Sequence, residues 1–302
     1  MKNHRLMKKI FAGSLALVSA LTIGSSAFAS ATKIADVSQY QGSINWSKAS
    51  KVLKLAIIRV KHGNSGDSDY TIDSKRNTNA NGAKKYGVPF GQYDYVEFNS
   101  TADAVKDARQ FYALSSSNAK FYALDNEHRV SSVKGKEQTY VNAWLSTMRS
   151  LTNKPVIYYS YQSFVSSHSI STSKFDGTWI ANYSAKPNVS TDLWQYTSSG
   201  SVSGISGNVD LSKVVDSKTV SSWYNYTSKA TYMTSIKSGT KVYATRAINR
   251  YKTANLTGKV ASVKYNTALT AKSIVKSSNG TARILLTNGT YITANKAYVQ
   301  TR

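Results

Sequence analysis

Two acidic residues stand one residue apart at the end of a short apolar run. The segment Lys120 to His128 reads Lys-Phe-Tyr-Ala-Leu-Asp-Asn-Glu-His, so Asp125 and Glu127 follow a run with the length of a buried strand. Side chains two residues apart on a strand point to the same face, with Cα atoms roughly 6 to 7 Å apart. Carboxyl groups this close influence each other's pKa. The pair therefore suits acid catalysis on a glycosidic bond, and a polar strand end is the alternative.

Three further acids, Asp36, Asp94 and Asp210, lie in segments that we predict to be strands. In a barrel of parallel strands the chemistry gathers at the C-terminal ends of the strands, so we expect all three at the same rim as the pair. Each could instead cap a helix or a turn. Aromatic residues on the same strands either line a groove and stack on sugar faces or fill the core: Tyr93, Tyr95, Tyr158, Tyr159, Trp179, Tyr183, Trp194 and Tyr196.

These residues need strands that deliver them to one place, and the first two thirds of the chain contain eight candidates. Amphipathic segments between them predict helices at Ala102–Leu114, Glu137–Leu151 and Arg76–Tyr86. Eight strands with few helices favour an α/β fold of the irregular TIM-like barrel type over an open sheet. The predicted strands are Lys33–Val37, Leu55–Val60, Val88–Val96, Phe121–Asp125, Pro155–Ser160, Thr178–Tyr183, Asp192–Tyr196 and Gly207–Leu211.

Charge divides the chain near Asp216. All fifteen acids lie at or before that residue, whereas residues 217–302 hold fourteen Lys or Arg and no acid. We therefore predict a catalytic barrel at 31–216, a linker at 217–230 and a basic module at 231–302. Short alternating segments and the Asn288-Gly289 turn predict a small all-β module. Tyr-x-Thr-Ala-Asn occurs at both Tyr251 and Tyr291, either as a worn repeat or by chance.

The N-terminus has the pattern of a secretory signal peptide, predicted to be cleaved after Ala29. Four basic residues precede an apolar run that is short for a membrane span, and no second run of spanning length follows. The chain has no Cys, and its His residues at positions 4, 62, 128 and 168 show no metal-ligand spacing. We therefore expect a secreted protein that needs no metal and no cofactor.

With these residues assembled, the region from about Ile34 to Val215 resembles the lysozymes of glycoside hydrolase family 25. The resemblance rests on motifs in the family's order: Asp36-Val37-Ser38-x-x-Gln41-Gly42 with Ile44-Asn45-Trp46, Ala56-Ile57-Ile58-Arg59-Val60, Asp73 with Asn79, Ala83 and Gly87, Leu124-Asp125-Asn126-Glu127, Lys154-Pro155-Val156-Ile157-Tyr158, Trp179-Ile180-Ala181-x-Tyr183, Leu193-Trp194-Gln195-Tyr196 and Val209-Asp210.

The resemblance implies hydrolysis of the β-1,4 bond between N-acetylmuramic acid and N-acetylglucosamine in peptidoglycan. It implies that Glu127 is the general acid and that Asp125 positions or stabilises the reacting sugar, directly or through the sugar's own acetamido group. Asp36 and Asp210 would complete the catalytic group. The expected substrate-binding residues are Asp94, Tyr93, Tyr95, Tyr158, Trp179, Tyr183, Trp194 and Gln195.

The chain departs from the family at Tyr93-Asp94-Tyr95, where a Tyr-His-Phe triplet is usual, so Asp94 would add an acid at the rim. Two other functions stay open: a non-catalytic wall-binding protein on the same barrel, and a hydrolase of chitin or another N-acetylglucosamine polymer.

The end of the chain, from Asn288 to Val299, is similar to surface-layer-type wall-anchoring modules. Its charge predicts binding to the anionic polymers of a cell wall, and nucleic acid is not expected as a partner. A plain spacer domain is the alternative.

Overall fold

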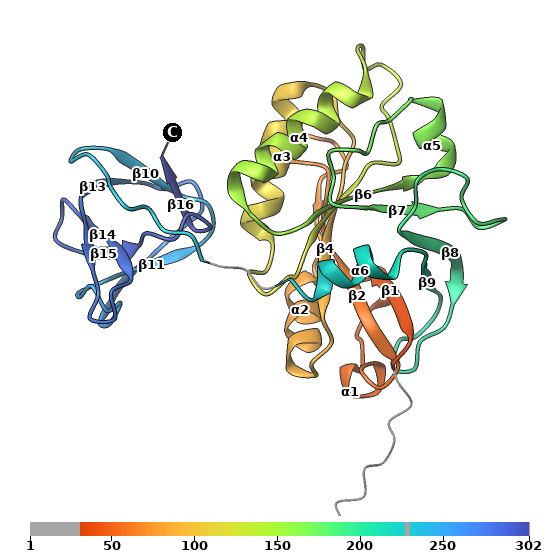
Figure 1. Ribbon diagram of the computed structural model, residues 1–302, viewed down its shortest axis with the longest axis horizontal. Coiled ribbons are helices and arrows are strands. Elements are labelled where there is room, and N and C mark those ends of the chain that lie inside the picture. Colours follow the sequence, from red (N-terminus) through yellow and green to blue (C-terminus); the bar gives the residue numbers. More distant parts are fainter. Residues whose placement is uncertain (1–30, 227–229, 302) are drawn as a thin grey trace, which may run out of the picture.

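The computed structural model describes residues 31–226 and 230–301, which form a barrel and a smaller sheet (Figure 1). The predicted signal peptide, residues 1–29, lies outside these described residues. Within the described ranges, no helix combines the length and the apolar character that crossing a membrane requires.

Eight strands close the barrel because β1 (Lys33–Val37) pairs with both β2 (Leu53–His62) and β9 (Val209–Val214). The order around the barrel is β1-β9-β8-β7-β6-β5-β4-β2, and only β9 among these strands runs antiparallel to its neighbours. The expected eight-stranded α/β barrel is confirmed. The remaining strands are β3 (Thr71–Ile72), β4 (Phe90–Tyr95), β5 (Tyr122–Asp125), β6 (Val156–Tyr161), β7 (Thr178–Ala181) and β8 (Leu193–Gly200).

Few helices surround the barrel, and the longest two, α3 (Thr101–Leu114) and α4 (Glu137–Leu151), pack side by side on its outer face (Figure 1). The helix α3 begins where the Ser100 side chain accepts a hydrogen bond from the Asp103 backbone N–H, which satisfies one free donor of the first turn. The other helices are the 3-10 turn η1 (Gln39–Gln41), α1 (Trp46–Ala49), α2 (Arg76–Lys85), α5 (Gln162–Ser167) and α6 (Ser217–Tyr224).

Alternate residues of each strand point into the barrel or out towards the helices, as the pleat of a strand requires. On β6, Ile157 and Tyr159 belong to the core inside the barrel, whereas Val156 and Tyr158 pack in the outer layer. The interior is tight: a Cβ atom at Gly91 would lie 2.3 Å from the Phe121 ring. Whether a side chain points into the barrel or out of it is therefore decided by its position in this alternation along the strand.

The helix α6 closes the N-terminal end of the barrel and corrects the predicted linker. Val220 and Trp223 are fully buried in the inner core, and the Trp223 indole donates to the Asp176 carbonyl at 3.2 Å. We expected a linker from residue 217, and this was wrong for Ser217–Tyr224. The segment is rich in Ser and Thr, but its two fully buried residues, Val220 and Trp223, lie three apart and share one helix face.

The C-terminal module is a seven-stranded sheet with its own core, which confirms the expected all-β module. The two copies of Tyr-x-Thr-Ala-Asn meet in it, since Tyr251 and Tyr291 are paired across neighbouring antiparallel strands. The strand order is β12-β11-β15-β14-β13-β10-β16. The strands are β10 (Lys241–Ala244), β11 (Ile248–Tyr251), β12 (Lys259–Val263), β13 (Ala268–Lys276), β14 (Ala282–Leu286), β15 (Tyr291–Thr293) and β16 (Val299–Thr301).

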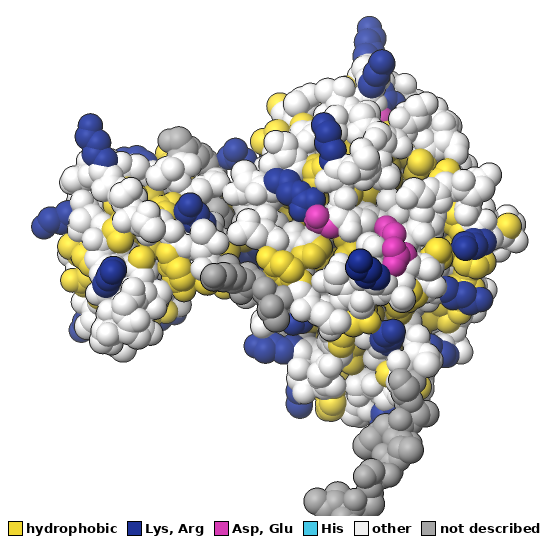
Figure 2. Space-filling view, in the orientation of Figure 1, with side chains coloured by type: hydrophobic (Ala, Val, Ile, Leu, Met, Phe, Trp, Pro, Cys, Tyr) yellow, Lys and Arg dark blue, Asp and Glu magenta, His cyan; other side chains and the backbone are white. Residues whose placement is uncertain are grey.

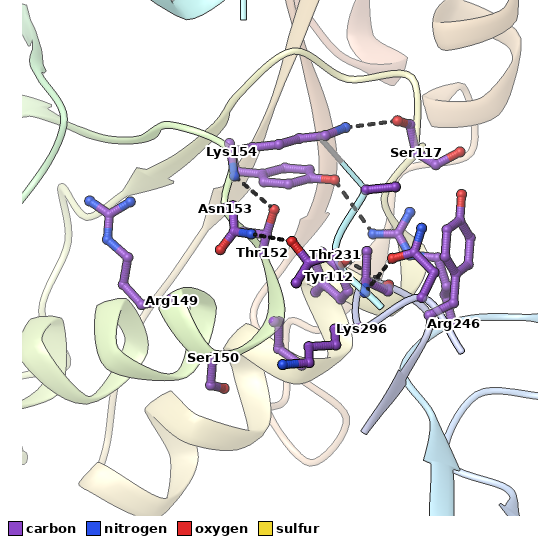
Figure 3. Close-up of a pocket in the computed structure, with 16 residues that line it drawn as sticks. Tyr112, Ser117, Arg149, Ser150, Thr152, Asn153, Lys154, Thr231, Arg246 and Lys296 are labelled. Carbon is purple, nitrogen blue, oxygen red and sulfur yellow. Dashed lines mark hydrogen bonds between the residues drawn. The ribbon is translucent and has the colours of Figure 1, made fainter. Parts of the chain in front are cut away.

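A buried arginine joins the module to the barrel (Figure 3). The guanidinium of Arg246 lies 4.1 Å from the Tyr112 ring centroid and donates to the Ser115 carbonyl, just beyond the end of α3. Tyr112 in turn donates through its hydroxyl to the Ala297 carbonyl at 2.7 Å. A pocket of about 400 Å³ lies at this junction, with Lys154 on its barrel side. The cations here satisfy carbonyl groups at a helix C-terminus, where positive charge is stabilising.

Candidate active site

A cleft of about 210 Å³ opens at the C-terminal rim of the parallel strands. Asp125 is the last residue of β5, and Glu127 follows it after one residue, so both carboxyl groups line this cleft. The sequence expectation that the pair faces the same way agrees with this geometry. All four acids that we expected to be catalytic lie here: Asp36, Asp125, Glu127 and Asp210.

Asp36 and Asp210 face each other across the pairing of β1 with β9. Asp210 is the second residue of β9, and it reaches the rim because this strand runs antiparallel to the others. Burial and then the charge of Asp210 raise the pKa of Asp36 well above its usual value. Burial raises the pKa of Asp210 as well.

Burial also raises the pKa values of the central pair. The pKa of Asp125, whose exposed fraction is 5%, is raised well above its usual value by burial and then by the charges of Glu127 and Asp36. Burial raises the pKa of Glu127 to about 7, while hydrogen bonding by Tyr159 acts in the opposite direction. The cleft therefore keeps one carboxyl group protonated near neutral pH.

A hydrogen-bond network around Gln195 connects the aromatic wall to the acids. The Gln195 amide oxygen accepts from the hydroxyl groups of Tyr159 at 2.8 Å and Tyr183 at 2.9 Å, and its Nε2 donates to Asp36 at 2.9 Å. The Trp179 ring lies 4.3 Å from that of Tyr159. Tyr93, Tyr95, Trp179, Tyr183 and Gln195, all expected to bind substrate, line the cleft.

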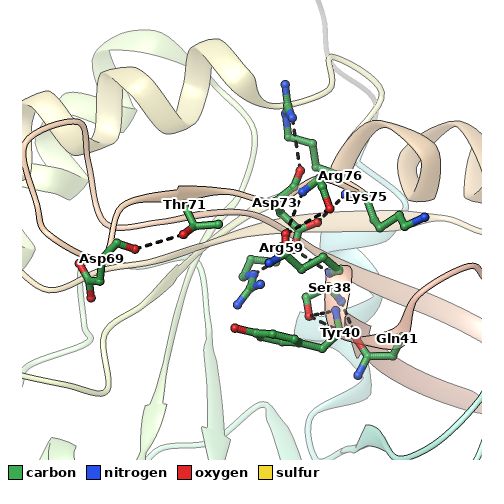
Figure 4. Close-up of polar contacts among 11 residues, drawn as sticks. Ser38, Tyr40, Gln41, Arg59, Asp69, Thr71, Asp73, Lys75 and Arg76 are labelled. Atoms are coloured by element: carbon green, nitrogen blue, oxygen red, sulfur yellow. Dashed lines mark hydrogen bonds and ion pairs between the residues drawn. The ribbon is translucent and has the colours of Figure 1, made fainter.

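An ion pair at the edge of the cleft holds the turn after β1 (Figure 4). Asp73 accepts from Arg59 Nε at 3.0 Å and from the Gln39 backbone N–H at 2.8 Å. The Arg59 guanidinium then lies 4.7 Å from the Tyr40 ring centroid. Arg59 and Tyr40 both line the cleft, and so do Gln41, Tyr159 and Tyr161.

Tyr159 was among the aromatic residues expected either to line a groove or to fill the core, and the other four were not predicted as site residues. Alternation along the strand could have predicted Arg59, Tyr159 and Tyr161. They lie two or four residues from Ile57 or Ile157, which point into the barrel, so they point to the same side.

Three expected site residues point away from the cleft, and the expectations for them were wrong. Asp94 is fully buried in the outer layer, where it pairs with Lys61 at 2.7 Å and accepts from the Trp144 indole at 3.0 Å. Tyr158 is also fully buried there, with its hydroxyl directed to Asn126. Trp194 donates to the Asn182 carbonyl at 2.7 Å outside the barrel. Each is the direct sequence neighbour of a residue that lines the cleft, and therefore points to the opposite face of its strand. The neighbours are Tyr93, Tyr159 and Gln195 respectively.

A second polar group lies at the same rim, beside the cleft. His62, Asp69 and Glu97 bring their donor atoms within 4.8 Å of one another, a set that is able to hold a metal ion. Sequence spacing did not reveal this group, because its members come from separate strands and loops.

Known proteins share the barrel region. Residues 35–205 match the sequence model of Glycosyl hydrolases family 25, and residues 226–299 match a Domain of unknown function (DUF5776). Lysozyme M1 of Streptomyces globisporus is 28% identical over 201 residues, which are 59% of this chain and 66% of that protein.

Two solved structures superpose on the barrel with a TM-score of 0.58. One is GHIP, described as a glycosyl hydrolase 25 of Streptococcus pneumoniae, which is 25% identical in sequence. The match covers 64% of this chain and 92% of the GHIP chain. The other is the catalytic domain of endolysin Ply40 from bacteriophage P40 of Listeria monocytogenes, which is 26% identical in sequence. The match covers 65% of this chain and 98% of the Ply40 chain.

Proposed function

Since the chain belongs to glycosyl hydrolase family 25, we propose that it is a lysozyme that cleaves the β-1,4 bond between N-acetylmuramic acid and N-acetylglucosamine in bacterial peptidoglycan. One observation carries this proposal: Asp125 and Glu127 share a cleft in which burial raises the pKa of Glu127 to about 7. A general acid is most effective when its pKa lies near the working pH.

In this proposal Glu127 protonates the oxygen of the leaving sugar, and Asp125 stabilises the positive charge that develops on the other sugar. Asp125 is the more deeply enclosed of the two, so its negative charge acts through little water once the glycan fills the cleft. Water attacks the anomeric carbon directly, or the sugar's own acetamido oxygen displaces the leaving sugar first and water then opens the cyclic intermediate; either route consumes one water. Asp36 and Asp210 set the charge beside the pair, and Gln195, which accepts from Tyr159, holds Asp36 in place.

The experiment that tests this function is mass spectrometry of the soluble products released from purified peptidoglycan. We expect the wild-type protein to release muropeptides that end in reducing N-acetylmuramic acid, and Glu127→Gln, which keeps the size of the side chain, to release none. Unfolding curves of both proteins control for the fold. Reducing N-acetylglucosamine ends would overturn the bond specificity. No products from the wild-type protein would favour a non-catalytic wall-binding protein.

We further propose that the protein is exported and that the module at 231–302 holds it on the anionic polymers of the wall. Fourteen Lys or Arg without an acid follow Asp216 in the sequence, and Figure 2 shows such side chains on the module with no acid on the face drawn. Attraction of this kind weakens as salt screens it. The resemblance of Asn288 to Val299 to surface-layer-type modules supports the same role.

A triple variant tests the anchoring role while the module stays whole. Lys252, Lys259 and Lys276 are exposed, and their replacement by Gln removes three charges without disturbing the core. We expect wall binding at low salt to weaken at least several-fold, with a shallower dependence on salt. Product release from soluble wall fragments is the control and should not change. Unaltered binding of the triple variant would contradict the proposal.

A further inference from the structure

Four side chains from the ends of three neighbouring strands meet beside the cleft. His62 ends β2, Asp69 lies in the loop after it, Glu97 follows β4 and His128 follows β5. The Nε2 atom of His62 lies 3.0 Å from the Asp69 carboxylate and 3.5 Å from Glu97 Oε1. The same Glu97 oxygen lies 3.0 Å from His128 Nδ1. One imidazole and two carboxylates therefore surround one small volume, and His128 lies next to it on the far side of Glu97.

These spacings suit a tetrahedral metal ion. Zinc binds His nitrogen and carboxylate oxygen at about 2.0 to 2.2 Å, so neighbouring donors around a tetrahedral ion lie roughly 3.3 to 3.6 Å apart. The separations from His62 Nε2 to Asp69 and Glu97, 3.0 and 3.5 Å, come within a few tenths of an ångström of that spacing, and all three donor atoms lie within 4.8 Å of one another. The ligand set of imidazole and carboxylate also suits zinc.

The ring nitrogen of His62 gives an independent indication. It is buried and lies between two carboxylates, yet it makes no hydrogen bond of acceptable geometry with either. The imidazole is held in this orientation by the Tyr95 ring, at 4.3 Å between centroids in an edge-on arrangement. A fixed nitrogen that faces two oxygens without bonding to them is arranged as a metal ligand.

We propose that His62, Asp69 and Glu97 bind one divalent transition-metal ion, best matched by Zn²⁺, with the fourth position open to water. The three side chains are between 18% and 42% exposed, so an ion reaches them from solvent. His128 directly follows Glu127 and contacts Glu97, so the bound ion lies beside the segment that carries Glu127. Metal binding in this site is independent of the proposed hydrolysis.

Calorimetric titration of the chelator-treated mature protein with Zn²⁺ tests the site. We expect one ion per chain and at least a tenfold loss of affinity in both His62→Gln and Asp69→Asn. His168→Gln is the matched control, because His168 stacks on Phe164 away from this group, and its affinity should equal that of the wild type. Substitution with Co²⁺ should give the intense visible absorption of a tetrahedral ion.

Three outcomes bear on the proposal. Absence of saturable binding by the wild-type protein would overturn it, and so would equal affinity in wild type, His62→Gln and Asp69→Asn. Binding that persists in His128→Gln but is lost in the other two variants would support the three-residue site. Unfolding curves of each variant without metal separate loss of the site from loss of the fold.

Discussion

Asp36 and Asp210 lie opposite each other on adjacent antiparallel strands, and both line the cleft. Two carboxyl groups in this arrangement hold a proton that each would lose in water. Burial and the charge of Asp210 raise the pKa of Asp36, so the native state binds this proton more tightly than the unfolded chain does. The relationship therefore affects stability as well as catalysis.

The raised pKa of Asp36 predicts how stability depends on pH. A carboxyl group whose pKa is raised in the native state favours folding least at high pH, so its contribution falls as pH rises from about 4 towards the native pKa. Asn at position 36 mimics the protonated form and does not titrate. We expect Asp36→Asn to lose less stability than the wild type between pH 4 and pH 7, as measured by urea unfolding. Equal losses would show that Asp36 does not hold the proton.

The pKa of Glu127 predicts the alkaline limb of the activity. The protonated form is the general acid, so kcat/KM should fall as pH rises through about 7, approaching tenfold per pH unit above it. The measurement uses soluble wall fragments, so that binding by the basic module does not alter the profile. A rate that stays level to pH 9 would exclude Glu127 as the acid.

Two adjacent tyrosines form a matched pair of tests. Tyr159 lowers the pKa of Glu127, so Tyr159→Phe should move the alkaline limb to higher pH and reduce kcat/KM. Tyr158 bonds Asn126 in the outer layer, so Tyr158→Phe should cost about 1 kcal/mol of stability without moving the limb. Both changes remove one hydroxyl group. A shift of the alkaline limb of kcat/KM in Tyr158→Phe, or no shift in Tyr159→Phe, would contradict the assignment of Tyr159 to the cleft side of β6 and of Tyr158 to the outer side.

Asp94 should matter for folding and not for substrate. It pairs with Lys61, which also pairs with Asp107 on α3, and all three are almost fully buried. Removing one partner of a buried ion pair typically costs about 3 to 5 kcal/mol. We therefore expect Asp94→Ala to be destabilised by about that amount in urea, with KM unchanged for the folded fraction. A raised KM with normal stability would instead show that Asp94 contributes to substrate binding at the rim.

Arg246 should join the two parts of the molecule. Its guanidinium packs on Tyr112 and donates to Ser115 O, and a desolvated cation on an aromatic ring contributes about 2 kcal/mol. We expect Arg246→Ala to lower the unfolding temperature of the module in calorimetry. Arg250→Ala removes the same charge from β11 and should change stability by less than about 0.5 kcal/mol. Equal effects in both variants would mean that charge alone, and not this junction, is responsible.

The sequence by itself determined the architecture and the central pair of acids. Apolar runs of strand length, separated by two clear amphipathic segments, predicted the eight strands and the helices α3 and α4, because these patterns depend on periodicity within a segment. Asp125 and Glu127 follow one strand directly, so their common direction needed no knowledge of other strands. The absence of acids after Asp216 likewise indicated a separate module, but it placed the boundary one short helix too early, because α6 belongs to the barrel.

Only the tertiary structure decided which face of each strand is the inside. Tyr158 and Tyr159 are equally plausible from their types, and a shift of one residue moves a side chain from the cleft to the outer layer. The same step separates Asp94 from Tyr93 and Trp194 from Gln195. Pairings between distant segments, such as Asp36 with Asp210 and His62 with Glu97, depend on strand order and direction. Periodicity within a segment carries no information about its neighbours, so these contacts appear only when the barrel closes.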